Sequence, residues 1–149
     1  MERMARKGGE TVFIPPMLLE KVKEPYNHPS YIFEPKLDGH RLILSYSEEA
    51  TRLYTRHNTN VTFKYPELHI NNKVPSMILD GEVCVLNNDG SDSFEQLMQR
   101  FALSDNKRIA RSASNNPVTY FVFDILYFDG RDVRLLPLHE RKGILKEAF

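Results

Sequence analysis

The chain has 149 residues, 41% of them hydrophobic and 27% charged, which fits one folded domain and excludes a disordered polypeptide. Its 20 basic and 20 acidic side chains give a formal net charge of zero, so composition does not indicate autonomous tight binding to a long DNA duplex. Cys84 is the only cysteine, which excludes an internal disulfide and a four-cysteine metal site and favours a reducing, cytoplasmic location.

The N-terminal part of the chain is polar and broken by prolines. Residues 1–12 are charged, contain glycine and carry no apolar signal-peptide core, so we expect a flexible lead-in before a domain spanning residues 13–149. Met17–Val22 could form a short amphipathic helix, because Met17, Leu18 and Val22 would share one face.

The middle of the chain predicts strands separated by turns. Tyr31–Phe33 and Arg41–Tyr46 are β-favouring runs, and the turn residues Lys36–Gly39 lie between them. Leu53–Thr55 is the next strand candidate, and Met77–Leu86 predicts a strong strand that is broken only at its central Asp-Gly-Glu.

One short segment is ambiguous and one helix is well marked in the following region. Lys64–Ile70 has no clear period, although Pro66 could open a short helix there. Ser93–Phe101 predicts a helix, with Ser93 as N-cap, Gln96 as its reciprocal capping-box partner and an apolar stripe along one face.

The last third predicts a loop, a long strand and a helix. Ser112–Pro117 is polar and is interpreted as a loop, and Val118–Phe128 is the most β-rich stretch, ended by the turn pair Asp129-Gly130. Leu138–Phe149 has helical spacing. The order of these elements favours an α+β fold with antiparallel β-sheets and flanking helices.

Lys36 lies in the run Glu-Pro-Lys-Leu-Asp-Gly-His-Arg, which starts at Glu34 and is the centre of the functional interpretation. A lysine that attacks phosphorus must lose its proton, and burial beside other cations would favour that loss. A bare Lys-x-Asp-Gly is nevertheless more often an ordinary hairpin turn. The sequence has neither of the glycine-rich phosphate-binding motifs, so any nucleotide would be bound by another route.

Four signatures in order and spacing resemble the covalent nucleotidyltransferases, in particular ATP-dependent DNA ligases of bacterial or phage type. They are Lys36-x-Asp38-Gly39-x-Arg41, then Thr55-Arg56-His57-Asn58, then Leu79-Asp80-Gly81-Glu82, and finally Phe123-Asp124-Ile125-Leu126-Tyr127. A further family feature, Ser-Phe-x-x-Leu-x-x-Arg, is matched by Ser93, Phe94, Leu97 and Arg100.

This resemblance implies an ATP-grasp-like adenylation domain and a catalytic group made of Lys36, Asp38 and Arg41. Lys36 would attack the α-phosphate of ATP, release pyrophosphate and hold AMP covalently, with Mg²⁺ as the metal cofactor and no metal ligand among the assigned residues. The implied nucleotide-binding set is Glu34 at the adenine edge, Lys36, Arg41 and Arg56 at ribose or phosphate, Glu82 at the ribose hydroxyl, and Phe123 stacked on the purine.

Each of these roles has a plainer alternative. Phe123 could be a core residue, because strand alternation places it on the same face as Phe121. Glu82 could be solvated in a turn, and Arg56 could be an ordinary surface residue. His57-Asn58 replaces the family's usual Asn-Gly after the arginine, although asparagine tolerates the positive φ that such a turn requires.

The chain ends at Phe149, before the family's metal-binding Glu-Gly signature, its Lys-x-Lys signature and its OB-fold domain. We therefore expect a partial adenylation domain that alone is weak or inactive in nick sealing, with a sheet edge that could mediate self-association. In the whole protein, the expected partner is nicked or broken duplex DNA in repair, replication or recombination, at the nucleoid. An RNA ligase, a capping-type nucleotidyltransferase and a non-catalytic nucleotide-binding module are the alternatives.

Overall fold

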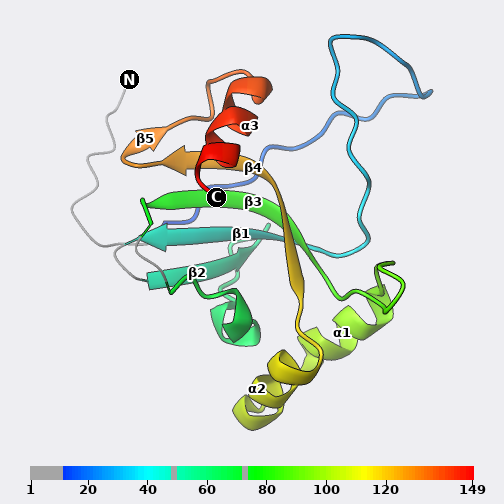
Figure 1. The fold of residues 1–149 in the computed structure, drawn as a ribbon, viewed down its shortest axis with the longest axis vertical. Helices are drawn as coiled ribbons and strands as arrows, with labels where there is room; N and C mark the ends of the chain where they lie inside the picture. The colour runs from blue at the N-terminus through cyan, green and yellow to red at the C-terminus, as the bar shows by residue number, and fades with distance from the viewer. Residues whose placement is uncertain (1–11, 48–49, 72–73) are drawn as a thin grey trace.

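The computed structural model describes residues 12–47, 50–71 and 74–149, which form one antiparallel sheet with helices at two of its ends (Figure 1). The expected lead-in falls almost wholly on residues 1–11, outside the described residues. The elements in chain order are β1 His40–Ser47, β2 Ala50–Thr55, the 3-10 turns η1 Thr62–Lys64 and η2 Pro66–Leu68, β3 Met77–Cys84, α1 Phe94–Ala102, α2 Asn106–Asn115, β4 Thr119–Phe128, β5 Arg131–Asp132 and α3 Leu138–Glu147.

The sheet has five strands in the order β2-β1-β3-β4-β5, and each neighbouring pair is antiparallel. This confirms the predicted α+β class with an antiparallel sheet. Alternation along β1 divides its side chains between two apolar clusters. Leu42 and Leu44 pack into the larger cluster, whereas Ile43 packs with Ile14 and Ile78 on the opposite face. The same alternation places Arg41 on the face of Ile43, where the candidate site lies.

Two expected elements before β1 do not form. Residues 17–22 are not helical, and Tyr31–Phe33 is not a strand; Leu18 and Leu19 are 82% and 89% exposed. A strand needs a hydrogen-bonding neighbour, and Figure 1 shows residues 18–38 as a long loop that projects away from the sheet. Local β-propensity was therefore insufficient to recruit Tyr31–Phe33 to the sheet.

The strand β3 runs through Asp80-Gly81-Glu82 without the expected break. Gly81 is needed at this point because the ring of Tyr120 packs over it, 2.6 Å from where a Cβ atom would lie. The Tyr120 hydroxyl then reaches across the sheet and donates hydrogen bonds to the carbonyls of Leu42 and Leu79. The irregularity expected in β3 is found in β4, which bulges opposite Asp80 and Gly81.

The helix α1 confirms the Ser93–Phe101 prediction, and the Ser93 hydroxyl accepts the N-cap hydrogen bond from the Gln96 amide. The Gln96 side chain bonds to Asn87 and Asn116 instead of completing a capping box. The short helical turn expected from Pro66 is confirmed as η2.

The helix α2 was not predicted, and the interpretation of Ser112–Pro117 as a loop was wrong for its first four residues. Ile109 is its single buried side chain and its mean hydropathy is low, so the helix has too few large apolar residues to form a stripe like that of α1. The Asp105 carboxylate caps the helix by accepting from the Arg108 amide.

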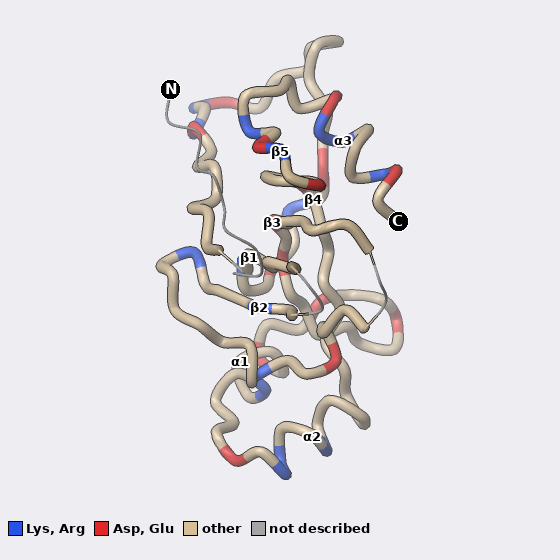
Figure 2. Tube along the Cα trace, turned by 90° about the vertical axis from the view of Figure 1, so that its left-hand side faces the viewer, with Lys and Arg blue, Asp and Glu red and all other residues tan. Residues whose placement is uncertain are grey.

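The C-terminal region confirms the predicted strand, turn and helix. β4 ends at a turn in which Asp129 and Gly130 have φ of 43° and 83°. α3 packs on β4, and its Arg141 forms a buried two-pronged ion pair with Asp124 at 2.8 and 3.0 Å. Figures 1 and 2 place α3 at one end of the molecule and the α1–α2 pair at the other. Within the described residues, no helix has the length and apolar character needed to cross a membrane.

Candidate functional site

A cavity of about 360 Å³ lies where the segment before β1 meets the face of β1, β3 and β4. Cavities of this size are in the range that holds small ligands. Five residues predicted to bind the nucleotide line it, namely Glu34, Lys36, Arg41, Glu82 and Phe123, together with Leu19, Pro35 and Leu37. Strands β1, β3 and β4 and the preceding loop thus bring together five predicted residues that are separated by up to 89 positions in the chain.

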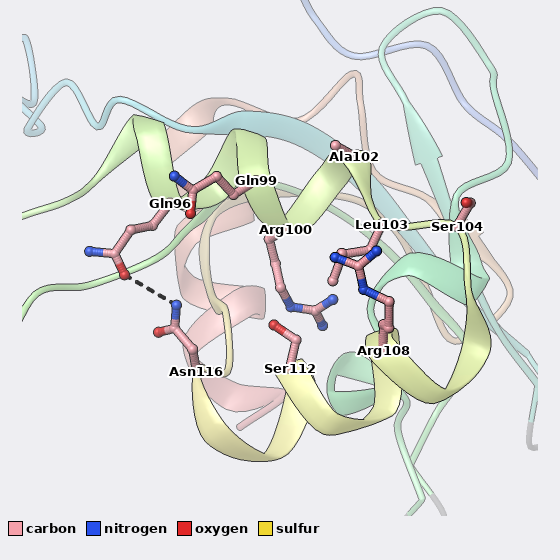
Figure 3. Close-up of a pocket in the computed structure, with 9 residues that line it drawn as sticks. All are labelled: Gln96, Gln99, Arg100, Ala102, Leu103, Ser104, Arg108, Ser112 and Asn116. Atoms are coloured by element: carbon pink, nitrogen blue, oxygen red, sulfur yellow. Dashed lines mark hydrogen bonds between the residues drawn. The ribbon is translucent and has the colours of Figure 1, made fainter.

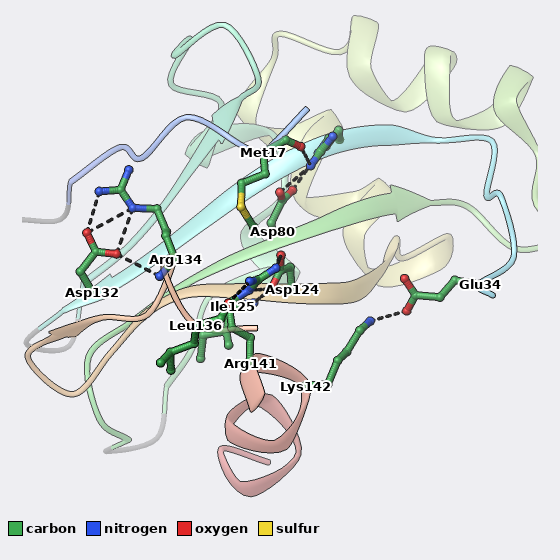
Figure 4. Close-up of polar contacts among 11 residues, drawn as sticks. Met17, Glu34, Asp80, Asp124, Ile125, Asp132, Arg134, Leu136, Arg141 and Lys142 are labelled. Carbon is green, nitrogen blue, oxygen red and sulfur yellow. Dashed lines mark hydrogen bonds and ion pairs between the residues drawn. The ribbon is translucent and has the colours of Figure 1, made fainter. Parts of the chain in front are cut away.

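Arg41 is fixed in one wall of this cavity by a buried carboxylate. Its Nε and Nη2 atoms donate to the two oxygens of Asp80 at 2.9 and 2.7 Å, and Nη2 also donates to the Met17 carbonyl at 2.8 Å (Figure 4). The hydrogen bond that Arg41 donates to Asp80 raises the pKa of Arg41, so the guanidinium remains charged. Because Asp80 neutralises much of this charge, Arg41 offers an anchored hydrogen-bonding group rather than a free cation.

Phe123 projects into the same cavity because β4 bulges there. In the register of β3 and β4, Asp80 faces Asp124 and Gly81 faces Val122, so Phe123 is the extra residue of the bulge. A bulge redirects side chains, which places Phe123 and Asp124 on the same side despite their adjacency. The guanidinium of Arg41 lies 5.3 Å from the centre of the Phe123 ring, a cation–π distance. This contact gives the ring a fixed orientation at the cavity wall.

Glu82 lies beside Arg41 on the adjacent strand and is half-buried. Burial raises the pKa of the Glu82 carboxyl, while Arg41, a backbone hydrogen bond from Gly39 and the charge of Lys36 partly offset that rise. Gly39 can approach so closely only because it has no side chain, since a Cβ atom there would overlap the Val83 carbonyl and approach the Cys84 sulfur at 2.8 Å. The glycine of the Lys-x-Asp-Gly run thus has a steric role.

Lys36 lies in a loop four residues before β1, as expected for a turn residue, and its side chain is exposed. Two nearby contacts hold this segment. The Glu34 carboxylate forms an ion pair with Lys142 of α3 (Figure 4). The Asp38 amide donates to the Asp92 carboxylate at 2.5 Å. Asp38 is exposed and does not line the cavity.

Arg56 lines a second hollow of about 560 Å³ that shares Arg41 and Glu82 with the first. It follows β2 in a turn where Asn58 has a φ of 63°, so the positive φ expected at this asparagine is confirmed. The exposed Arg56 side chain donates to the His57 ring at 2.9 Å. The structure therefore places five of the six predicted nucleotide-binding residues in one cavity and Arg56 in the neighbouring one.

The carboxylates near this site do not form a resident metal centre. No group of three or more His, Cys, Asp or Glu side chains suited to a metal ion occurs in residues 12–47, 50–71 and 74–149. Asp80 and Asp124 are each occupied by an arginine, and Glu34 is paired with Lys142. Only Glu82 remains at the cavity without a salt-bridge partner, among the described residues, and one carboxylate cannot hold a divalent ion alone.

Asp80 and Asp124 are structural members of the site that sequence reasoning did not identify. Each lies in a signature that was interpreted through its neighbour, Glu82 or Phe123. A usable signal existed, because an aspartate inside an apolar strand must find a charged or hydrogen-bonding partner when buried. Cys84 is fully buried, and burial raises its pKa to about 11, so it packs as a small apolar side chain.

Comparison with known proteins places these features in context. Residues 16–149 match the family described as "ATP dependent DNA ligase domain". The chain is 43% identical over 134 residues to the SPbeta prophage-derived DNA ligase-like protein LigB of Bacillus subtilis, covering 90% of this chain and 47% of that protein. It is 35% identical over 124 residues to a DNA ligase of Thermoplasma volcanium, covering 78% of this chain and 21% of the relative. The chain thus spans about half the length of LigB and less of the archaeal enzyme.

A solved structure agrees with these sequence relationships. The structure of a mycobacterial DNA ligase D complexed with ATP and MES superposes with a TM-score of 0.63 at 30% identity. The match covers 76% of this chain and 35% of that one. The five-stranded sheet described above therefore resembles part of the fold of that ligase.

Proposed function

The chain belongs to the ATP-dependent DNA ligase family, and on this premise we propose that residues 13–149 are part of an adenylation domain in which Lys36 accepts AMP from ATP. The observation that carries the proposal is the convergence of Glu34, Lys36, Arg41, Glu82 and Phe123 on one cavity. If the Lys-x-Asp-Gly run were only a hairpin turn, there would be no reason for family-signature residues on three different strands to line the same cavity.

The proposed step is a displacement at the α-phosphorus of ATP. The neutral Lys36 amine forms a P–N bond, the bond from the α-phosphorus to the bridging oxygen breaks, pyrophosphate leaves and the nitrogen releases its proton to solvent. AMP is then bound covalently to Lys36 as a phosphoramidate. Lys36 is exposed at the cavity, so the amine has access to both the nucleotide and a proton acceptor.

The cavity wall supplies positioning for this step. Phe123 offers an aromatic face for a purine, and Glu82 offers an acceptor for a ribose hydroxyl. Arg41, held by Asp80, offers its remaining donors to the ribose or the α-phosphate. We propose that Arg56 contacts the nucleotide from the adjoining hollow and that Asp38 acts on the orientation of the Lys36 loop through its backbone contact with Asp92.

We propose Mg²⁺ as part of the nucleotide substrate, entering as Mg-ATP. Magnesium in phosphoryl-transfer sites is commonly bound by substrate phosphates and one or two carboxylates, with water completing its shell. Because Glu82 is assigned to the ribose hydroxyl, the substrate phosphates and water would hold the ion here. The divalent ion would offset charge on the transferring phosphate.

The proposed partner of the whole protein is nicked or broken duplex DNA, which would receive AMP on its 5′-phosphate before the strands are joined. The ligase relatives support this assignment. A ligase role implies work on the chromosome in repair, replication or recombination, and we propose a cytoplasmic, nucleoid-associated location. A fluorescent fusion that stays away from the nucleoid would contradict that location.

Self-association through a sheet edge is the weaker partner proposal. Leu53 of the edge strand β2 already accepts from the Val61 amide, and its own amide donates to Thr62. The other edge strand, β5, has two residues. Light scattering after size-exclusion chromatography would test for self-association. If the chain is a dimer and Arg131→Pro in β5 converts it to a monomer, the result would support association through the β5 edge.

The experiment for adenylation uses the 149-residue chain with labelled ATP or GTP, Mg²⁺ and a denaturing gel. We expect covalent label from ATP, abolished in Lys36→Ala and retained in Lys23→Ala, an exposed lysine of the same loop. Labelling from GTP alone would favour a capping-type enzyme. Saturable ATP binding that is identical in Lys36→Ala, without any covalent label, would show a non-catalytic module and overturn the proposal.

A further inference from the structure

A third cavity, of about 550 Å³, lies between α1 and α2 and shares no lining residue with the Lys36 cavity. Figure 3 shows side chains from both helices converging on it. α1 separates this cavity from the hollow that contains Arg56, because Phe101 lines that hollow while Arg100 and Ala102 line this cavity. The lining is Gln96, Gln99, Arg100, Ala102, Leu103, Ser104, Arg108, Ser112 and Asn116.

Arg100 is the feature of this cavity that its role in the fold does not explain. The residue is 2% exposed, and its Nη2 atom donates to both oxygens of Glu67 at 2.7 and 3.0 Å. Its Nε and Nη1 atoms are buried and have no hydrogen-bond partner among the described residues. Buried donors without acceptors are costly, so a group that accepts from them would be strongly favoured.

Figure 3 shows the Arg100 side chain extending from α1 into the cavity toward α2, where Ser112 and Arg108 also point inward. A planar guanidinium presents several N–H donors in a fixed fork that suits tetrahedral oxyanions, and a serine hydroxyl can donate to another oxygen. The three side chains therefore supply donors from two directions around one volume.

The charge of the cavity also favours an anion. Its lining includes two arginines and no carboxylate. Glu67, which lies outside the cavity lining, neutralises the charge of Arg100. The charge of Arg108 is not neutralised in this way, so the lining has a net positive charge. The whole of α2 carries three basic residues and no acidic one, as the basic positions along this helix in Figure 2 show.

We propose that the cavity between α1 and α2 binds a phosphate group, held by an N–H donor of Arg100 that has no partner in the fold, by Arg108 and by the Ser112 hydroxyl. The site is independent of Lys36 and does not rest on the proposed adenylation. The phosphate could belong to free inorganic phosphate or to a phosphodiester of the DNA backbone, and both present the same oxyanion to these donors.

The first test is a titration of the whole chain with inorganic phosphate, followed by NMR of ¹⁵N-labelled arginine side chains. We expect the Arg100 Nε–H signal to move saturably, because that donor gains an acceptor. In Arg108→Gln the affinity should fall about tenfold, as for loss of one charge-assisted contact. Arg111→Gln removes the same charge from an exposed position on the same helix and should leave the affinity unchanged.

Arg108 is used because it is exposed and forms no salt bridge among the described residues, whereas a change at Arg100 would also break its buried pair with Glu67. Ser112→Ala provides an independent variant with no change in charge and should also weaken phosphate binding. Covalent labelling of Lys36 is a separate readout, so failure here does not affect the adenylation proposal.

The second arm identifies the source of the phosphate with a short DNA duplex. Weaker duplex binding in Arg108→Gln than in Arg111→Gln, with competition by inorganic phosphate, would assign the site to the DNA backbone. Equal duplex binding in both variants, with phosphate still moving the Arg100 signal, would assign it to free phosphate. If phosphate leaves the Arg100 signal in place and neither ligand distinguishes the variants, the proposal is overturned.

Discussion

The two halves of the Lys36 cavity are built in different ways. The sheet half consists of side chains on β1, β3 and β4, in which Arg41 is anchored on the buried Asp80 and Phe123 is aimed by a bulge. The loop half carries Glu34 and Lys36 on an exposed segment without regular secondary structure. It is held by the ion pair with Lys142 and the Asp38–Asp92 contact.

This contrast indicates a division of labour. The wall that would recognise the nucleotide is preformed, because its side chains are fixed by buried partners whose loss is costly. The segment that would carry the nucleophile is held by exposed contacts that are individually weak, so it can change position at small cost. Substitutions in the wall should therefore affect stability, and substitutions in the loop should affect adenylation with little change in stability.

The largest expected effect is in the wall, at Asp80. Asp80→Asn removes the charge partner of Arg41 at a site where the carboxylate is 1% exposed. We expect the free energy of unfolding to fall by about 3 kcal/mol, as for breaking a buried ion pair. The matched change Glu34→Gln in the loop, where the carboxylate is 46% exposed, should alter it by less than about 1 kcal/mol. Urea denaturation measures the free energy of unfolding of both variants. Equal decreases in the two variants would contradict the proposed difference between wall and loop.

Three glycines sharpen the comparison. Gly81→Ala places a methyl group 2.5 Å from the Phe121 carbonyl and should destabilise the sheet by about 1–3 kcal/mol through overpacking.

Gly39→Ala, at the junction of loop and wall, should reduce adenylation more than stability, because the loop can move away from β3. Gly143→Ala has no atom within 4 Å and should stabilise α3 by up to about 1 kcal/mol.

These glycine variants are compared by thermal unfolding and by covalent labelling with ATP. The contrast between Gly39 and Gly81 fails if Gly39→Ala loses as much stability as Gly81→Ala while keeping its labelling. Gly143→Ala serves as the control for the effect of adding a methyl group.

A smaller effect is expected from Lys142, which ties the loop to α3. Lys142→Ala should leave stability nearly unchanged and slow the labelling of Lys36 by up to about fivefold, since an exposed pair contributes up to about 1 kcal/mol. Lys146→Ala, on the same helix and exposed, is the control. An identical labelling rate in the two variants would show that the Glu34–Lys142 pair does not position the loop.

The smallest effect concerns His40, at the start of β1, whose ring packs edge-on against Phe101 and Phe94. Burial lowers the pKa of His40 below its ordinary value of 6.5. The unfolded chain therefore takes up the proton first, so stability is full above pH 6.5 and falls as the pH drops through the lowered value. The His40→Phe variant should lose less stability than the unsubstituted chain as the pH falls through this range. Unfolding midpoints measured at several pH values test this, and the same pH dependence in both proteins would contradict it.

The sequence was sufficient to predict the sheet and most of the site, for identifiable reasons. β1, β3 and β4 carry long β-favouring runs, and their signatures place Arg41, Glu82 and Phe123 at defined positions. Three features depended on tertiary structure. Tyr31–Phe33 lacks a neighbouring strand, the bulge at Phe123 arises from the pairing of β3 with β4, and α2 has too few apolar residues to be recognised.

The burial that would favour proton loss from Lys36 is not found in the structure, for a related reason. The motif identifies the lysine, but the exposure of its side chain depends on which other segments pack against its loop. Among the described residues, Lys142 and Asp92 hold this loop through Glu34 and Asp38. Similarly, Asp80 and Asp124 were visible as aspartates in apolar strands, whereas their partners Arg41 and Arg141 could be assigned only from the fold.

The most direct test of the central claim is the intact mass of the chain after prolonged incubation with Mg-ATP, followed by peptide mapping. Long incubation accumulates the covalent product even when the step is slow. The account predicts one added AMP, located on Lys36, lost in Lys36→Ala and removed when pyrophosphate is added. An AMP adduct on another lysine, or ATP binding in the cavity with no adduct at Lys36, would contradict it.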